Sequence, residues 1–70
     1  MVEQINIDFG NKVRDLRNKL GISQEELAER CGLHRNYIGL IERAETNATL
    51  SCVYKIAKAL GLRKIVEIFN

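Results

Sequence analysis

Arginine, asparagine and leucine side chains in the middle of the chain have the chemistry to read DNA bases. Arg35 and Asn36 are neighbours, and Leu40 lies one helical turn after Asn36. A guanidinium can donate hydrogen bonds to guanine O6 and N7 at the same time. A carboxamide can pair with adenine or bond a phosphate, and a leucine can contact a thymine methyl. We therefore expect Arg35, Asn36 and Leu40 to contact bases. The alternative is that they are solvated surface residues, which is equally common for an isolated exposed leucine.

A second group of polar side chains can hold the sugar–phosphate backbone of DNA. Such contacts add affinity and salt dependence without reading sequence. For His34 the alternative is to cap the helix that follows it, and for Tyr37 the alternative is to form the edge of the core. The residues expected to contact the backbone are Gln24, His34, Tyr37, Arg43, Thr46 and Asn47.

The remaining reactive residues do not suggest an enzyme or a metal site. The chain has one histidine and two cysteines, Cys31 and Cys52, without a Cys-x-x-Cys spacing. These are too few ligands for zinc, and the sequence offers neither an obvious acid pair nor a phosphate-binding loop. We expect a protein that is not an enzyme and that needs no metal and no cofactor. Cys31 is expected to be an inert core residue, whereas Cys52 can face a partner subunit or the DNA.

Two short helices joined by a glycine turn would position these side chains. Ser23-Gln24-Glu25-Glu26 has the pattern of a capping box, which predicts a helix that starts at Ser23 and is ended by Gly32. A second helix is predicted over 34–42, with Ile38 and Ile41 facing inward. This arrangement is typical of a helix-turn-helix, whose second helix enters the DNA major groove. Gly39, on the outer face, is unfavourable in a helix and indicates a close approach by another group.

Three more helices are predicted around this unit. A first helix over 7–20 is predicted to end at Gly21, and a fourth over 50–60 is predicted to begin after the N-cap Thr49. Their apolar stripes are Phe9, Val13, Leu16 and Leu20, and Leu50, Val53, Ile56, Ala57 and Leu60. The fifth helix, over 63–69, is apolar on more than one side. Four residues are therefore divided between core closure and a dimer interface: Leu62, Ile65, Ile68 and Phe69.

Composition favours a small all-α domain inside the cell. A chain of 70 residues is expected to form one domain over 1–70, and the absence of proline favours a helical bundle over a β-barrel. The net charge of +2 is by itself weak evidence for a nucleic-acid partner. The sequence has no apolar run of membrane-spanning length and no secretion signal, so we expect a cytoplasmic bacterial protein that does not bind membranes.

Residues 9–62 resemble the DNA-binding domain of the Cro/phage-repressor type, the XRE family. Three blocks match in order and spacing: LGISQEELA over 20–28, YIGLIER over 37–43 and KIAKALGL over 55–62. The resemblance implies an all-α, five-helix, lambda-repressor-like fold with a helix-turn-helix formed by helices 2 and 3. It also implies that Arg17 and Glu42 form a partly buried ion pair between the first helix and the recognition helix.

A narrower resemblance is to the controller proteins of restriction–modification systems. It is carried by GLHRNYI over 32–38, by IERAE over 41–45 and by Asn47. Those proteins are free-standing domains that dimerise through C-terminal helices. They bind paired operator boxes upstream of the endonuclease gene and act as activator and repressor. Many family members have glycine in place of Ala44 and proline in place of Ala48, so the loop after the recognition helix departs from the pattern.

The resemblance implies a sequence-specific transcription regulator that binds a pseudo-palindromic operator at its own promoter as a homodimer, with room for two dimers per operator. Its recognition helices would enter successive major grooves about 34 Å apart. Activation would need contact with RNA polymerase, for which the acidic face with Glu25 and Glu29 is a candidate. The alternatives are another XRE-type repressor or an antitoxin, and a protein-interaction module that does not bind DNA. Arg35, Asn36 and Arg43 favour DNA, because an adaptor would carry acids or a larger apolar patch there.

Overall fold

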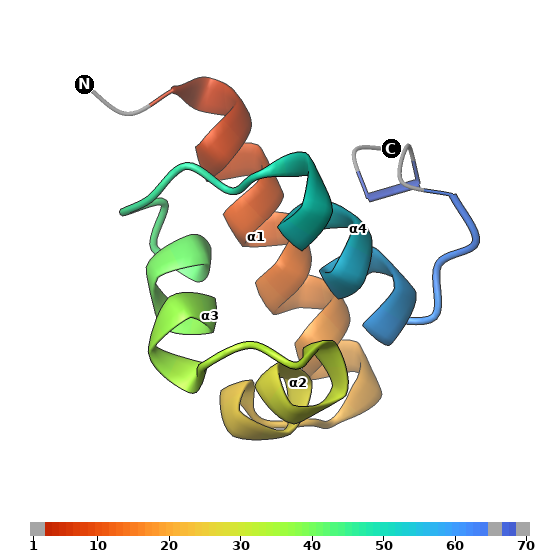
Figure 1. Cartoon of the computed structure of the whole chain (residues 1–70). Helices are drawn as coiled ribbons and strands as arrows, with labels where there is room; N and C mark the ends of the chain where they lie inside the picture. The colour runs from red at the N-terminus through yellow and green to blue at the C-terminus, as the bar shows by residue number, and fades with distance from the viewer. Residues whose placement is uncertain (1–2, 65–66, 69–70) are drawn as a thin grey trace.

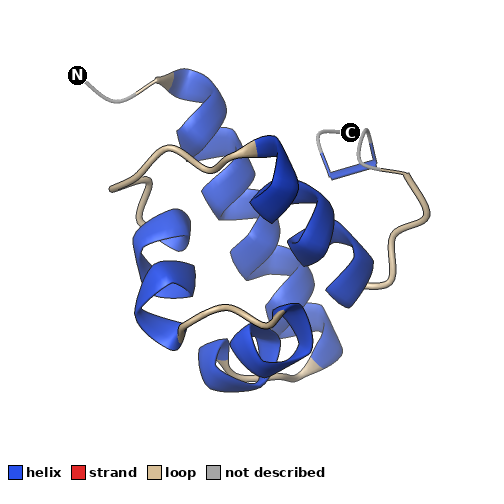
Figure 2. Cartoon of the chain, viewed as in Figure 1, coloured by secondary structure: helices blue, strands red, loops and turns tan. Residues whose placement is uncertain are grey.

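The described part of the chain forms four α-helices, which confirm the predicted all-α class. The computed structural model describes residues 3–64, 67 and 68, and none of these residues forms a strand (Figures 1 and 2). No helix within those ranges is both long enough and apolar enough to cross a membrane. The helices are α1 (Gln4–Leu20), α2 (Gln24–Cys31), α3 (Arg35–Glu42) and α4 (Leu50–Ala59).

The helix boundaries follow the capping residues in the sequence. Ser23 Oγ accepts a hydrogen bond from the Glu26 amide at 3.0 Å, and Thr49 Oγ1 accepts one from the Cys52 amide at 3.2 Å. These bonds satisfy amides that have no partner inside the helix, and both caps were predicted. Gly21 ends α1 in the left-handed conformation, at φ 70°, again as predicted. The one large difference is that α1 begins at Gln4, three residues before the expected start.

The expected fifth helix over 63–69 is wrong for the residues that the structure describes. Glu67 and Ile68 lie in a single 3₁₀ turn, in which the Glu67 amide donates a hydrogen bond to Lys64 O at 3.1 Å. The Glu67 carboxylate accepts the amides of Arg63 and Lys64, at 3.0 and 2.8 Å. This local side-chain capping favours a tight turn over a continuing α-helix.

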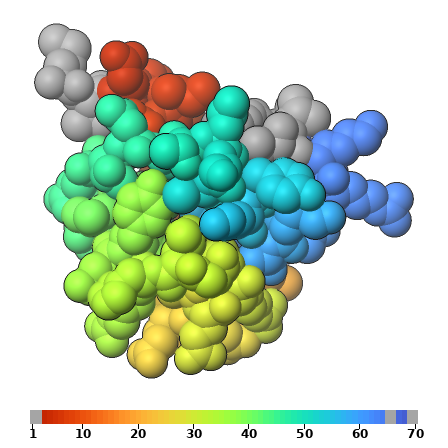
Figure 3. Space-filling model, viewed as in Figure 1, coloured from red at the N-terminus to blue at the C-terminus, as the bar shows by residue number. Residues whose placement is uncertain are grey.

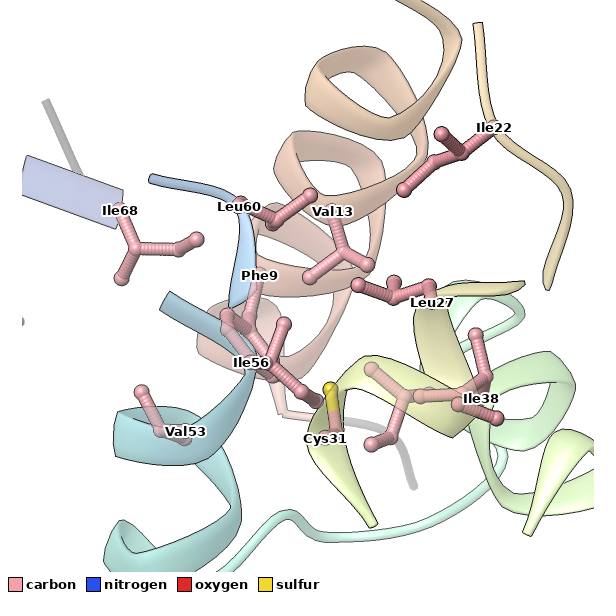
Figure 4. Packing of buried hydrophobic residues seen from close by; sticks show 12 residues of the cluster. Phe9, Val13, Ile22, Leu27, Cys31, Ile38, Val53, Ile56, Leu60 and Ile68 are labelled. Atoms are coloured by element: carbon pink, nitrogen blue, oxygen red, sulfur yellow. The ribbon is translucent and has the colours of Figure 1, made fainter. Parts of the chain in front are cut away.

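The core lies where the four helices meet, and side chains from all of them point toward one another there (Figure 4). Val13, Leu27 and Ile56 are completely buried and come from α1, α2 and α4. Ile38 and Ile41 of α3 face inward as predicted, and Ile68 closes the cluster from the C-terminal turn. Burying one such side chain contributes about 1.5–3 kcal/mol.

Two residues predicted for the core are exposed instead. Leu20 keeps 50% of its surface in solvent and Leu50 keeps 81%. Leu20 is the last residue of α1 and Leu50 the first of α4, so both project beyond the helices that cover the middle of each stripe. Ile22, which follows the turn after α1, is buried against the core.

Gly10 allows α1 to approach the end of α3 at backbone distance. A Cβ built at Gly10 would overlap the carbonyl oxygens of Ile41 and Glu42. Larger residues would therefore force the two helices apart. The close packing of α1 on the end of α3, which carries the predicted DNA-reading side chains, therefore depends on Gly10.

Candidate nucleic-acid interface

The N-terminus of α2 and the outer face of α3 border one open hollow at the surface. The predicted base-contacting residues Arg35, Asn36 and Leu40 all line it, and two predicted backbone-contacting residues share it with them. In Figure 3 the atoms of α3, in green, lie at the periphery of the visible face and are open to solvent. The full lining is Gln24, Arg35, Asn36, Gly39, Leu40 and Arg43.

Glu42 is the buried charge that joins three helices beneath this surface. Only 4% of the residue is exposed. Its carboxylate accepts from Arg17 Nε at 2.7 Å and Arg17 Nη2 at 3.1 Å, so the ion pair implied by the resemblance is present. Arg14 also lies near it, with Nε 3.8 Å from Glu42 Oε1. Pairing and hydrogen bonding are what make a buried carboxylate tolerable, and they raise the pKa of Arg17 above its ordinary value.

Gln24, expected to meet a phosphate, also bonds this carboxylate. Its Nε2 donates to Glu42 Oε1 at 3.1 Å. A carboxamide nitrogen has two protons, so one remains for a phosphate at the N-terminus of α2. The buried ion pair therefore fixes a side chain that lines the surface hollow.

Arg43 is the group that approaches closely at Gly39. Its guanidinium lies over the glycine, where an added Cβ would be 3.0 Å from Arg43 Nη1. Arg43 Nε also donates to Glu45 Oε1 at 2.9 Å. The close approach expected at Gly39 is thus made by the side chain of the same helix, which lies flat along its outer face.

Arg35 has an acidic neighbour that sequence reasoning did not assign to it. Arg35 Nη1 lies 3.5 Å from Glu25 Oε2 of α2. The two residues are ten positions apart, so only the packing of α2 against α3 brings them together. The pairing of Arg43 with Glu45, in contrast, could have been predicted from the sequence, because Glu45 follows Arg43 by only two residues.

Tyr37 is half-buried at the edge of the core, and its hydroxyl points to the N-terminus of α4. Hydrogen bonding with the Cys52 side chain is the main cause that raises the pKa of Tyr37. The Thr49 hydroxyl, as the main cause, lowers the pKa of the Cys52 thiol. Burial raises the pKa of Cys31, in keeping with its predicted place in the core. The orientation of Cys52, left open by the sequence, is toward the recognition helix.

The loop after α3 carries the last two predicted backbone-contacting residues, Thr46 and Asn47. Asn47 is exposed, and its Oδ1 accepts a hydrogen bond from Asn6 Nδ2 on α1. Neither residue lines the hollow on α3. Ala44 opens the loop with φ 58°, the left-handed conformation that a glycine would adopt without strain. The bond from the Glu45 amide to Leu40 O, at 2.8 Å, closes the turn.

His34 caps α3. Its Nδ1 accepts from the Asn36 amide at 3.1 Å, so the capping alternative is realised. Across the described ranges, no three histidine, cysteine or acidic side chains are grouped as a metal site would need.

The expected dimer residues are divided between the core and parts outside the described ranges. Ile68 is completely buried within one chain, which favours core closure over dimer contact for this residue. Leu62 is partly buried and packs on the same cluster. Ile65 and Phe69 lie outside the described residues.

Comparison with known proteins places the fold in a family. A helix-turn-helix family model matches residues 13–68. The control protein C.BamHI of Bacillus amyloliquefaciens is 48% identical over 64 residues, which cover 90% of this chain and 79% of that protein. The control protein C.SmaI of Serratia marcescens is 58% identical over 53 residues, covering 76% of this chain and 63% of that protein.

A solved structure agrees over nearly the whole chain. The restriction–modification controller protein C.AhdI from Aeromonas hydrophila superposes with a TM-score of 0.89 at 39% sequence identity. The match covers 96% of this chain and 100% of that one. The chain therefore belongs to the helix-turn-helix family and, within it, to the group of restriction–modification control proteins.

Proposed function

We propose that this transcription regulator controls a restriction–modification system by binding an operator upstream of its own gene. The observation that carries the proposal is the hollow on α3, where Arg35, Asn36 and Leu40 share one exposed face. Arg35 would bond a guanine, Asn36 an adenine or a phosphate, and Leu40 a thymine methyl. The α2 N-terminus with Gln24 would hold a phosphate on the flank, as in other helix-turn-helix proteins.

The remaining expected contacts would hold the DNA backbone. Arg43, Thr46 and Asn47 follow α3 and would contact phosphates of the facing strand, while His34 and Tyr37 would act from the start of α3. Each such contact raises affinity for all DNA and makes it more sensitive to salt.

A homodimer would match a pseudo-palindromic operator, with a second dimer on an adjacent site. Leu50 and Tyr54 are 81% and 54% exposed and lie one turn apart on α4, so they offer an apolar stripe to a second copy. Leu62, Ile65 and Phe69 remain predictions for the same interface. Sedimentation of the Leu50→Lys variant tests the assignment: the stripe predicts dissociation at concentrations at which the unaltered protein is dimeric.

Activation would require contact with RNA polymerase. Glu29 is exposed on α2 and is offered for this contact, whereas Glu25 of the same acidic face is paired with Arg35. A Glu29→Gln variant that binds DNA normally and no longer activates transcription would support the assignment.

The first experiment is a fluorescence-anisotropy titration with the DNA upstream of the gene and with a scrambled duplex, at two salt concentrations. Binding to the upstream DNA that is about a thousandfold tighter or more would support autoregulation. Saturation at four chains would support two dimers per operator. Equal, weak and strongly salt-dependent binding of both duplexes would contradict the proposal, and would leave another repressor target, an antitoxin role or a protein partner.

A further inference from the structure

Arg35 borders two hollows, and these offer it two different ligands. It lines the hollow of the predicted base-reading residues with Asn36 and Leu40. It also lines a neighbouring hollow at the N-terminus of α2, together with Ser23 and Gln24. The second hollow is where a backbone phosphate is expected, because exposed amides and the helix dipole favour an anion there. An unpaired Arg35 would be free to bond that phosphate in DNA of any sequence.

Glu25 occupies this second hollow and not the first. Its carboxylate lies 3.5 Å from Arg35 Nη1, and both side chains are 64% exposed. An exposed ion pair of this kind contributes little to the stability of the fold. In this respect it differs from Arg17 and Glu42, whose carboxylate is only 2% exposed. The effect of Glu25 is therefore on the charge that Arg35 presents to DNA.

We propose that Glu25 is a specificity-determining residue that keeps Arg35 from binding phosphate in non-operator DNA. The inference rests on the proposed function. Non-specific binding is attraction between the protein and DNA phosphates. A phosphate that binds Arg35 would have to displace the Glu25 carboxylate, and would then lie beside that second negative charge. A guanine presents two neutral acceptors, and a guanidinium has five donors, so Arg35 can bond guanine while Glu25 stays on another edge. Glu25 thus weakens binding to arbitrary DNA more than binding to the operator.

Glu45 provides an internal comparison. It pairs with Arg43 at 2.9 Å, at the other end of α3. Arg43 is expected to bond phosphate in operator and arbitrary DNA alike, so Glu45 should weaken both complexes by the same factor. Asp15 provides a second comparison, because it pairs with Lys19 on α1, at 3.4 Å, away from both hollows.

The test is a titration of Glu25→Gln, Glu45→Gln and Asp15→Asn with an arbitrary duplex and with the upstream DNA, at several salt concentrations. Each variant loses one negative charge, so the three are matched in net charge. For Glu25→Gln we expect about threefold tighter binding to the arbitrary duplex, a salt slope steeper by about 0.9, and unchanged operator affinity. Glu45→Gln should tighten both complexes together, and Asp15→Asn should change neither. Thermal melting checks that each variant folds.

Three results would overturn the proposal. Glu25→Gln could tighten both complexes equally, as any added charge would. It could weaken the operator complex alone, in which case Glu25 orients the Arg35 side chain toward the base that it contacts. It could also change neither complex. Failure of the proposed function can be distinguished from failure of this proposal. If the proposed function is wrong, the unaltered protein binds both duplexes alike. Titration of the arbitrary duplex with Glu25→Gln would still show whether Glu25 competes with phosphate for Arg35.

Discussion

Arg17 and Glu42 join α1 to the last turn of the recognition helix through two hydrogen bonds, of 2.7 and 3.1 Å. Arg17 also donates from Nη1 to the backbone oxygen of Ile22 at 2.9 Å, in the turn that leads to α2. One guanidinium therefore fixes the start of the helix-turn-helix and the end of its second helix. This arrangement makes the packing beneath the proposed DNA-binding surface depend on a largely buried ion pair.

Removal of Arg17 should therefore cause a folding defect that resembles a binding defect. Arg17→Ala leaves the Glu42 carboxylate buried without its main partner, which should lower the free energy of unfolding by about 3 kcal/mol. Arg17→Lys keeps the charge but loses the two-point geometry, so its effect should be intermediate. Urea unfolding measures the loss. Unchanged stability of Arg17→Ala, together with weakened DNA binding, would contradict this role and indicate direct contact with DNA.

Ala44 should be a site at which glycine stabilises the protein. Its φ of 58° lies in the left-handed region, where a residue with a Cβ is disfavoured by about 1–2 kcal/mol. Glycine removes that strain but loses more backbone entropy on folding, so Ala44→Gly should stabilise by about 0.5–1 kcal/mol. The matched control is Ala48→Gly in the same loop, where φ is not positive and glycine loses both backbone entropy and the packing of a partly buried methyl group, so stability should fall. Thermal melting that ranks the two variants the other way would contradict this account.

The elements of the helix-turn-helix could be predicted because their signals are local. Ser23 and Glu26 are three residues apart, and Gly32 directly follows the helix it ends, so short-range chemistry sets those boundaries. The ion pair of Arg17 and Glu42 could be predicted only from the resemblance to the family. Composition and spacing alone do not join residues 25 positions apart.

Other features required the packed structure. The segment over 63–69 has helical periodicity, but the Glu67 carboxylate caps two preceding amides and its described part forms a tight turn. The pairing of Glu25 with Arg35 depends on how α2 lies against α3. Leu20 and Leu50 fit their helical stripes by spacing, yet each stands at a helix end, where half or more of the side chain is left exposed by the described residues. Periodicity identifies a face and does not show how far the neighbouring helix extends along it.

The two thiols should react with iodoacetamide at different rates. Cys52 is half-exposed and its pKa is lowered by the Thr49 hydroxyl, whereas Cys31 is buried and burial raises its pKa. Because the thiolate is the reacting species, Cys52 should be alkylated first at mildly alkaline pH. Since the pKa of Cys31 is raised on folding, its contribution to stability is present below the ordinary thiol pKa and lost as pH rises. Peptide mass spectrometry measures which thiol is alkylated first. Unfolding in urea should abolish the difference in rate between Cys52 and Cys31.

Gly39 offers a variant in which stability and DNA binding should change in opposite directions. Alanine is favoured over glycine inside a helix by about 1 kcal/mol, so Gly39→Ala should raise the melting temperature. The new Cβ would lie 3.0 Å from Arg43 Nη1, and a flexible guanidinium can move away at little cost to the fold.

That movement would take Arg43 from its place along the outer face of α3 and should weaken operator binding. If the lost contact is to a phosphate, the salt slope should become shallower by about 0.9, as in Arg43→Ala. A Gly39→Ala protein that is more stable and binds the operator with full affinity would show that the position of Arg43 over Gly39 does not matter for DNA. If Gly39→Ala does weaken binding, the cause could instead be that the glycine leaves space for the DNA itself. The Arg43→Ala, Gly39→Ala double variant separates the two causes, because in the second case the alanine would weaken binding even without the arginine.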